Sequence, residues 1–356
     1  MVSFIISVDT TFSMASNFFE HFLRDSFVQT SEVIIVVDGC DNIKIHSLLN
    51  KFLEHYNNLQ VFFREKAGYG AANNFGVSMS NGEYLFFINS DIFANSSCYT
   101  KMLEALKENR AECVQPLLVY PQSTNVQCAG TFFGPYFKEH LFDGNSVTAP
   151  IVQEAGYRQA LTSALYAMSR DVFLEYGGFD EFYFNKLESF ELSYKLTLDK
   201  KRCLYLPEAQ AYHSRGAGRG QYQFDFRQQE AYFWSRFGKT VTPDMDFYLT
   251  KQVTPAMQKY SYYALVMNQV RSWTSILQKL PLEFSSIYEM SWIPVSSINL
   301  FDILPNSFLS DPIPLAFIVT NIGQIKSNKY WMQLRNNPHD IILDNYANLV
   351  LAKDYI

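Results

Sequence analysis

The chain has 356 residues, enough for one large domain or two ordinary domains that each bury a core. A formal charge of −6, with Lys and Arg scattered, gives no basic surface for nucleic acid and no polybasic block for an anionic membrane. Five widely spaced cysteines indicate neither a disulfide framework nor a zinc cluster. With no signal-like segment and no bilayer-length apolar run, we expect a cytoplasmic protein that takes a small or carbohydrate ligand.

The N-terminal part alternates between strand-like and helix-like segments. Four runs rich in Val, Ile and Phe have the pattern of strands buried on both faces of a parallel sheet, at residues 3–9, 31–38, 59–65 and 83–91. Helical periodicity between them predicts helices around residues 18–23, 45–56, 71–80 and 96–109. This alternation predicts a doubly wound, Rossmann-like α/β sheet.

The remainder of the chain is less regular. Further strands are expected at 111–120, 160–169 and 202–206, a helix at 188–200 and a loop at 207–220. Beyond residue 240 a long helix over 256–280 and a strand at 314–320 are expected. We therefore predict an α/β domain at 1–240 and a mostly helical extension at 241–356. That extension would serve packing, acceptor binding or oligomerisation, and a homodimer stays open.

Three of the predicted strands end on an aspartate, namely Asp9, Asp38 and Asp91. A single aspartate at such a place usually caps the next helix. Three acids at successive strand ends favour function, because ligands of doubly wound sheets bind outside the carboxyl ends of the strands. The apolar run Tyr84–Ile88 is thus expected to be a central strand whose polar tip faces a site.

Further stretches carry residues suited to ligand chemistry: VVDGCD (36–41), AGYGAANNFG (67–76), INSD (88–91), GGFDEFYFNKLESFELSYKL (177–196) and AYHSRGAGRG (211–220). Gly68 and Gly70 let backbone approach a ligand closely before a helix begins. Asn89 and Asp91 lie two apart and so share one side of an extended segment. Such oxygen ligands suit Mg²⁺ or Mn²⁺.

The order of these stretches resembles the inverting family 2 glycosyltransferases of the GT-A fold, especially their rhamnosyltransferase-like members. The resemblance covers about residues 3–240 and is specific as a set. It implies that Asp9 and Asp38 hold the nucleoside, and that Asp91 and His213 ligate Mn²⁺ or Mg²⁺ on the donor diphosphate. It further implies contacts to the nucleotide sugar from Gly68, Gly70, Asn73, Asn89, Ser90, Arg215 and Arg219, the two arginines through their planar forks.

The chain departs from the family at the catalytic base. The family usually reads Glu-Asp-x-Asp where this chain has Glu188-Ser189-Phe190-Glu191, and a serine cannot accept a proton near neutral pH. We hypothesise that Glu188 is the base, with Glu191 as the second choice. An enzyme that has no base of its own, including a retaining one, stays open.

Two functions of different class remain at this point. The first is a metal-dependent transferase that moves a sugar from a UDP- or dTDP-sugar to a hydroxyl of a glycan, glycolipid or glycoprotein, in surface polysaccharide or glycoprotein glycan assembly. We expect such a transferase in the cytoplasm, with peripheral association at the inner face of the plasma membrane as an open possibility. The alternative is a catalytically impaired module of the same fold that binds nucleotides or carbohydrates.

Overall fold

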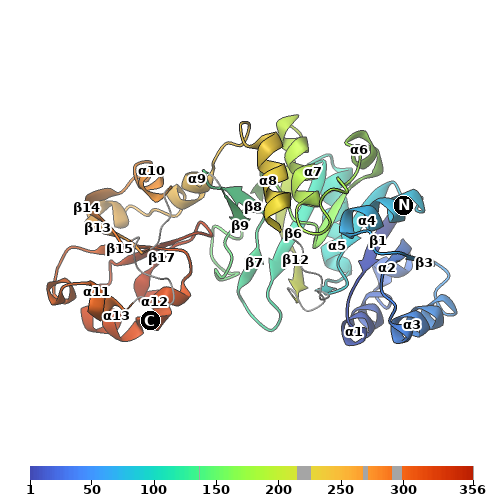
Figure 1. Ribbon diagram of the computed structural model, residues 1–356, viewed down its shortest axis with the longest axis horizontal. Coiled ribbons are helices and arrows are strands. Elements are labelled where there is room, and N and C mark those ends of the chain that lie inside the picture. Colours follow the sequence, from blue (N-terminus) through green and yellow to red (C-terminus); the bar gives the residue numbers. More distant parts are fainter. Residues whose placement is uncertain (136, 215–225, 268–271, 291–298, 356) are drawn as a thin grey trace. The chain divides into compact units, whose positions relative to one another are not determined.

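The computed structural model describes residues 1–135, 137–214, 226–267, 272–290 and 299–355 (Figure 1). The chain divides into two compact units, the first made of residues 1–131 and 143–241 and the second of residues 132–142 and 242–356. The division at 241/242 lies next to the boundary expected at 240. The short segment 132–142 was expected in the N-terminal domain, and the structure places it with the second unit instead.

The first unit is built on a large mixed sheet with the strand order β10-β12-β6-β11-β4-β1-β2-β3. Its parallel half consists of β1 (Val2–Val8), β2 (Glu32–Asp38), β3 (Leu59–Arg64) and β4 (Tyr84–Ile88). The other half holds β6 (Cys113–Val119), β10 (Gly156–Tyr157), β11 (Leu165–Ser169) and β12 (Cys203–His213), with β5 (Ile92–Phe93) beside β12 and β7 (Val126–Cys128) beside β6.

Helices cover both faces of this sheet, because successive strand residues point to opposite sides. On one face Phe4 and Ile6 of β1 pack in a core with side chains of α1 (Phe12–Phe22), α3 (Ile43–Leu53) and α5 (Ser96–Lys107). On the other face Ile5 packs in a core with α4 (Tyr69–Ser78) and α7 (Glu188–Leu198). This three-layer arrangement confirms the predicted doubly wound α/β fold. The remaining helices are α2 (Ser26–Gln29), α6 (Arg170–Glu175) and α8 (Phe226–Phe237).

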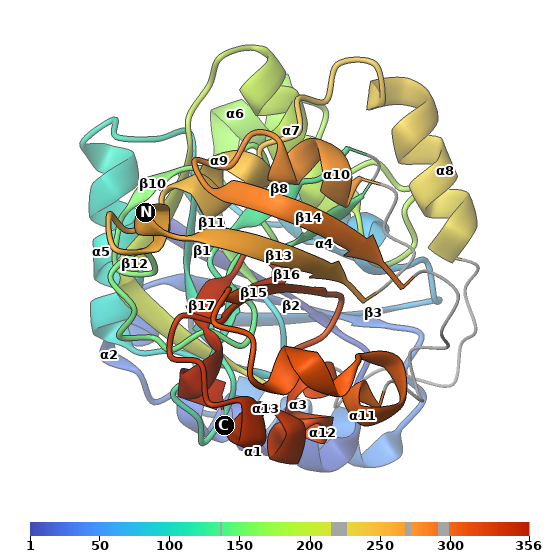
Figure 2. The same cartoon turned by 90° about the vertical axis from the view of Figure 1, so that its left-hand side faces the viewer.

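The second unit has its own sheet, with the order β14-β13-β15-β16-β17. The strands are β13 (Ser261–Val266), β14 (Glu283–Glu289), β15 (Leu315–Val319), β16 (Ile341–Asp344) and β17 (Leu349–Leu351), all parallel except β17. Short helices flank the sheet: α9 (Met245–Thr250), α10 (Trp273–Leu277), α11 (Leu300–Ile303), α12 (Gly323–Ser327) and α13 (Lys329–Arg335). Figure 2 shows α11, α12 and α13 together on one side of this sheet. A small two-stranded sheet, β8 (Thr131–Phe133) with β9 (Lys138–His140), completes the strands.

The prediction of a mostly helical second part is therefore wrong. The expected helix over 256–280 is replaced by a short 3₁₀ turn, the strand β13 and the short helix α10. The error has a physical reason: β13 is largely buried, and an unbroken apolar run such as Tyr262–Val266 is compatible with a buried strand as well as with a helix. The expected strand at 314–320 is confirmed as β15.

Candidate functional site

The carboxyl ends of β1, β2 and β4 border one cavity of about 140 Å³ in the first unit. The lining residues are Ser7, Asp9, Thr10, Asp38, Lys66, Tyr69, Asn89, Ser90, Asp91, Phe184, Asn185 and His213. The three acids that the sequence places at strand ends therefore meet at one rim, as expected for a doubly wound sheet. Most of the lining is polar, which suits a charged or hydroxyl-rich ligand better than an apolar one.

Asp91 and His213 are brought together by strand pairing. The short strand β5 follows Asp91 and runs antiparallel to the end of β12, with Ile92 opposite His213. The backbone N–H of Ser214 also donates to the carbonyl oxygen of Asp91 at 3.1 Å. As a result, Nε2 of His213 lies 3.3 Å from Oδ1 of Asp91. The loop predicted from residue 207 is wrong up to residue 213, because β12 extends that far and the strand presents the histidine.

A residue that the sequence analysis missed, Gln127 of β7, holds the other side of this imidazole. Its Oε1 accepts from Nδ1 of His213, and its Nε2 donates to the carbonyl oxygen of His213 at 2.9 Å. Gln127 is fully buried. No local motif marks this glutamine, because it meets His213 only through the pairing of β7 and β12 with β6.

Asp38 is engaged with the loop before α4. Its carboxylate, which is 1% exposed, accepts from the backbone N–H groups of Ala67 at 2.9 Å and Gly68 at 2.8 Å. Lys66, which the sequence analysis did not single out, forms an ion pair with Asp9 and lies 3.6 Å from Asp38. Asp38 thus orders the loop, whereas Asp9 and Lys66 together present charge to the cavity.

The structure does not bring Gly68, Gly70 and Asn73 into the cavity lining. Gly68 has a φ of +95°, and a Cβ there would lie 2.5 Å from the carbonyl oxygen of Phe184, so the glycine serves close backbone packing. Asn73 is buried inside α4 and donates to the carbonyl oxygen of Tyr69 at 2.8 Å. These three residues shape the start of α4 against the loop around Phe184.

Glu188 begins α7 and is 3% exposed. Burial raises its pKa to about 7, although the backbone N–H of Lys186 donates to its Oε2 at 2.7 Å. Glu188 is not among the cavity-lining residues, whereas Tyr69 lines the cavity. Burial first, then the charges of Glu188 and Asp91, raise the pKa of the Tyr69 hydroxyl. A carboxyl group with a pKa near 7 is partly ionised at neutral pH, and a general base needs a pKa near the working pH.

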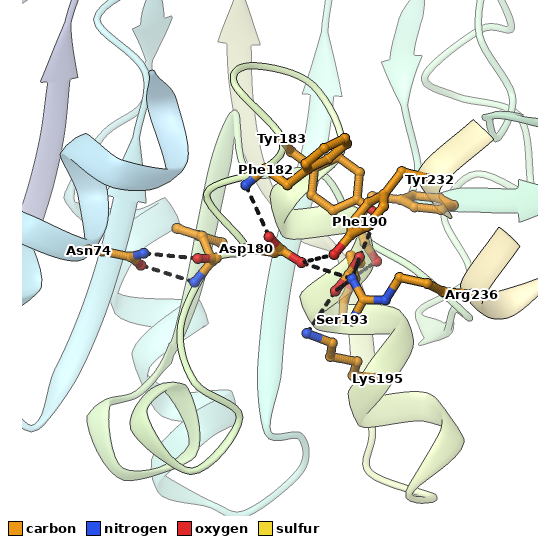
Figure 3. A network of polar contacts seen from close by, with 11 residues as sticks. Asn74, Asp180, Phe182, Tyr183, Phe190, Ser193, Lys195, Tyr232 and Arg236 are labelled. Atoms are coloured by element: carbon orange, nitrogen blue, oxygen red, sulfur yellow. Dashed lines mark hydrogen bonds and ion pairs between the residues drawn. The ribbon is translucent and has the colours of Figure 1, made fainter. Parts of the chain in front are cut away.

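Glu191, one turn further along α7, is fully buried. Figure 3 shows Asp180, Tyr183 and Arg236, which belong to the polar network around it. Its carboxylate contacts Nη1 of Arg236 at 2.9 Å and Nζ of Lys195 at 2.7 Å, and it accepts from the hydroxyl of Tyr183. Arg236 also bonds Asp180 at 2.8 Å, which ties the GGFD loop to α8. These contacts already occupy both carboxylate oxygens of Glu191.

A second cavity of about 690 Å³ is lined by residues of the strands that carry Asp91 and His213. Its lining residues are Phe93, Pro121, Gln122, Ser123, Thr124 and Tyr212. Phe93 and Tyr212 are paired neighbours on β5 and β12, and each directly adjoins a residue of the Ile92–His213 pair. Since side chains alternate along a strand, their rings lie on the face opposite to the imidazole of His213. Aromatic, hydroxyl and amide groups line this cavity, and none of its lining residues is charged.

Asp91 and His213 are the side chains best placed to hold a cation. Among the described residues, no group of three or more His, Cys, Asp or Glu side chains could hold a metal on its own. A carboxylate oxygen and an imidazole nitrogen 3.3 Å apart nonetheless suit neighbouring positions around one ion, with the remaining positions taken by ligand oxygens and water. Arg215 and Arg219, which the sequence predicts to contact phosphate, lie outside the described residues.

Within the ranges that the structure describes, no helix is both long and apolar enough to cross a bilayer.

Comparison with known proteins places this geometry in context. Residues 18–165 match the model of the family described as Glycosyl transferase family 2. Glycosyltransferase GlyG of Streptococcus pneumoniae is 25% identical over 115 residues, covering 32% of this chain and 38% of GlyG. Poly(ribitol-phosphate) beta-glucosyltransferase of Bacillus spizizenii is 23% identical over 212 residues, covering 54% of this chain and 33% of that protein. The chain thus spans well under half of the length of these relatives.

Among solved structures, GalNAc-T7 with UDP, GalNAc and Mn²⁺ is similar with a TM-score of 0.51 and 17% identity, covering 60% of this chain and 43% of that chain. At this identity the likeness concerns the fold alone. It confirms the GT-A fold expected for the N-terminal part of the chain.

Proposed function

We propose that this chain, which carries a family 2 glycosyltransferase domain over residues 18–165, moves a sugar from a nucleotide-sugar donor to an acceptor hydroxyl. The acceptor is a glycan, glycolipid or glycoprotein, and the donor is a UDP- or dTDP-sugar. The observation that carries the proposal is the Asp91–His213 pair at the rim of a polar cavity. A relative from Myxococcus xanthus named O-antigen biosynthesis protein RfbC, 25% identical over 196 residues, supports a role in surface polysaccharide assembly.

Asp91 and His213 would hold a divalent ion, Mn²⁺ or Mg²⁺, together with the donor diphosphate. The bound ion would offset the negative charge that develops on the departing nucleoside diphosphate, so that departure needs no proton. The solved structure of GalNAc-T7 with UDP and Mn²⁺ supports this choice of cofactor. Asp9 and Lys66, which follow β1 and β3 at the same edge of the sheet, would contact the nucleoside.

Glu188 is the residue that we assign as general base. An inverting transfer needs a carboxylate to take the proton of the acceptor hydroxyl as that oxygen attacks the anomeric carbon. Burial raises the pKa of Glu188 to about 7, which makes it a stronger base than an exposed carboxylate while it still ionises near neutral pH. Glu191 is better suited to structure, because Arg236, Lys195 and Tyr183 already occupy its oxygens.

We place a distal part of the acceptor in the second cavity, because its rings lie on the face of β5 and β12 opposite to His213, away from the proposed cation. A sugar is neutral and has an apolar face of C–H groups and a rim of hydroxyls, which match the aromatic rings and the Ser, Thr and Gln side chains there. Tyr212 is the main platform, since 42% of its surface is exposed.

We expect Tyr212→Ala to raise the KM for the acceptor by roughly 3- to 10-fold, as the loss of one aromatic contact predicts. The KM for the donor and donor hydrolysis without acceptor should stay unchanged, which shows that the neighbouring His213 still works. Tyr212→Phe, which keeps the ring, is the matched control and should behave like the wild type. Steady-state kinetics with varied acceptor measure this. An unchanged acceptor KM in the alanine variant would remove Tyr212 from the acceptor site.

The proposed function is tested by incubating the protein with a panel of UDP-, dTDP- and GDP-sugars in the presence of Mn²⁺, Mg²⁺ or EDTA. Release of nucleoside diphosphate from one donor is expected with either ion and should cease with EDTA. Donor binding in calorimetry without release from any member of the panel, with or without acceptors, would contradict the transferase. It would favour the alternative of a binding module in which Ser189 marks lost activity.

A further inference from the structure

We propose that Gln127 is a positioning residue that presents Nε2 of His213 to the divalent cation. This inference rests on the proposed function, because it concerns the same cation site. Gln127 lies in the middle of the short strand β7, and the residues on either side of it, Val126 and Cys128, have no role in the proposed site. It acts only through His213 and is not expected to touch the donor or the acceptor.

Within the described part of the chain, the Gln127 side chain forms two hydrogen bonds with His213, one to the ring and one to the main chain. The orientation of the amide follows from this pair of contacts. The carbonyl oxygen of His213 can only accept, so the NH₂ group of Gln127 must face it, at 2.9 Å. Oε1 is then left facing Nδ1 of the ring. If the amide were turned over, two acceptors would face each other at the main chain, which is unfavourable.

The amide orientation determines the protonation of the imidazole. Because Oε1 is an acceptor, Nδ1 must carry a hydrogen to satisfy it. In the neutral ring the lone pair is then on Nε2, the atom that lies 3.3 Å from Oδ1 of Asp91. Nδ1–H bonds to an uncharged oxygen are known to fix the tautomer and orientation of metal-binding histidines. Gln127 therefore preorganises the ring for a cation that sits between Nε2 and Asp91.

Burial makes this arrangement specific. Gln127 is fully buried, so water cannot readily replace its oxygen if the side chain is removed. Replacement by leucine would leave Nδ1–H without its partner and would free the ring to rotate. The expected consequence is weaker cation binding. A group that hydrogen-bonds a metal-binding histidine typically contributes about 10- to 100-fold to metal affinity.

The experiment measures Mn²⁺ affinity in the presence of UDP, with free Mn²⁺ followed by electron paramagnetic resonance. Gln127→Leu should bind Mn²⁺ about 10- to 100-fold more weakly than the wild type. Gln127→Glu keeps an oxygen for Nδ1–H but loses the bond to the main chain, and should bind within a few-fold of the wild type. Gln115→Leu is the matched control, since Gln115 is an equally buried glutamine of the same sheet whose side chain bonds Thr162, Pro116 and Cys128 rather than His213. It should leave Mn²⁺ affinity unchanged.

A spectroscopic measurement on the unmodified protein keeps the inference testable if Gln127→Leu does not fold. With ¹⁵N-labelled histidine, UDP and Mg²⁺, Nδ1 of His213 should be protonated and Nε2 should not. A ring protonated on Nε2 under these conditions would overturn the inference, as would unchanged Mn²⁺ affinity in folded Gln127→Leu. Equal losses in the leucine and glutamate variants would show that only the main-chain bond matters and would also overturn it. Failure of the wild type to bind Mn²⁺ would instead remove the cation site of the proposed function, and this inference with it.

Discussion

Asp91→Asn is expected to lower metal-dependent sugar transfer by about 1,000-fold, equivalent to ~4 kcal/mol of transition-state stabilisation. Asp91 is the only carboxylate that lies against His213 among the described contacts of that imidazole, so the variant loses the charge that holds the cation. Asparagine keeps the size and one oxygen, which separates the loss of charge from a change of shape. Nucleoside diphosphate release at varied Mn²⁺ concentration measures the effect, and the apparent affinity for Mn²⁺ should fall together with the rate.

Asp41→Asn provides the matched control for the Asp91 variant. Asp41 lies on the exposed loop after β2 and does not line the cavity. The activity of the Asp41→Asn variant should therefore equal that of the wild type. If Asp91→Asn kept near-normal activity at ordinary Mn²⁺ concentrations, the carboxylate would have no role in holding the cation. The assignment of the 140 Å³ cavity as the donor diphosphate site would then fail.

Glu188→Gln is expected to lower kcat by about 100- to 10,000-fold, the usual contribution of a general base. The affinities for donor and Mn²⁺ should not change, because Glu188 does not line the cavity. In the wild type, kcat should rise with pH through about 7 as Glu188 loses its proton, and this rise should be absent from the variant. Transfer by the variant at a near-normal rate would contradict the assignment and would favour an enzyme without a base of its own.

The same pKa shift predicts an effect on stability. Burial raises the pKa of Glu188 from 4.5 to about 7, so the folded protein keeps a proton that the unfolded chain releases at lower pH. The unfolded state thus binds fewer protons between these values, and the contribution of Glu188 to stability falls as pH rises through this range. Glu188→Gln, which stays neutral, should therefore melt at a higher temperature than the wild type above pH 7.

Glu191→Gln supplies the contrast within the same helix. The buried carboxylate of Glu191 pairs with Arg236 and Lys195, whose side chains are partly exposed, so solvent can compensate part of the loss when the pair is broken. Thermal unfolding of this variant should occur well below that of the wild type, whereas the activity that remains at low temperature should keep its dependence on pH. A stable Glu191→Gln variant without activity would instead make Glu191 the base.

The sequence predicts the first unit well because its signals are local. Continuous Val and Ile runs such as Val33–Val37 identify strands buried on both faces, and periodic side chains such as Ile45 and Leu49 identify the helix between them. The second unit shows the limit of such signals. The run from Tyr262 to Val266 is apolar without a decisive period, and only its pairing with β14 and β15 makes it a strand.

The candidate site is predicted only in part, for a related reason. The strand ends at Asp9, Asp38 and Asp91 follow from local patterns, and His213 was singled out by its place in the order of family motifs. Gln127 carries no signal of its own, because its partner is 86 positions away in the chain. Conversely, Gly68 has the sequence context of a ligand-binding glycine, but it packs closely against Phe184. This contact joins residues far apart in the sequence, so local patterns do not reveal it.

The most direct test of the whole account is a crystal structure of the protein with UDP and Mn²⁺, in which anomalous scattering locates the ion. The account predicts one strong Mn²⁺ peak in direct contact with the carboxylate of Asp91 and with Nε2 of His213, bridged to the diphosphate. A Mn²⁺ ion bound to the diphosphate elsewhere, with neither of these side chains among its ligands, would contradict it.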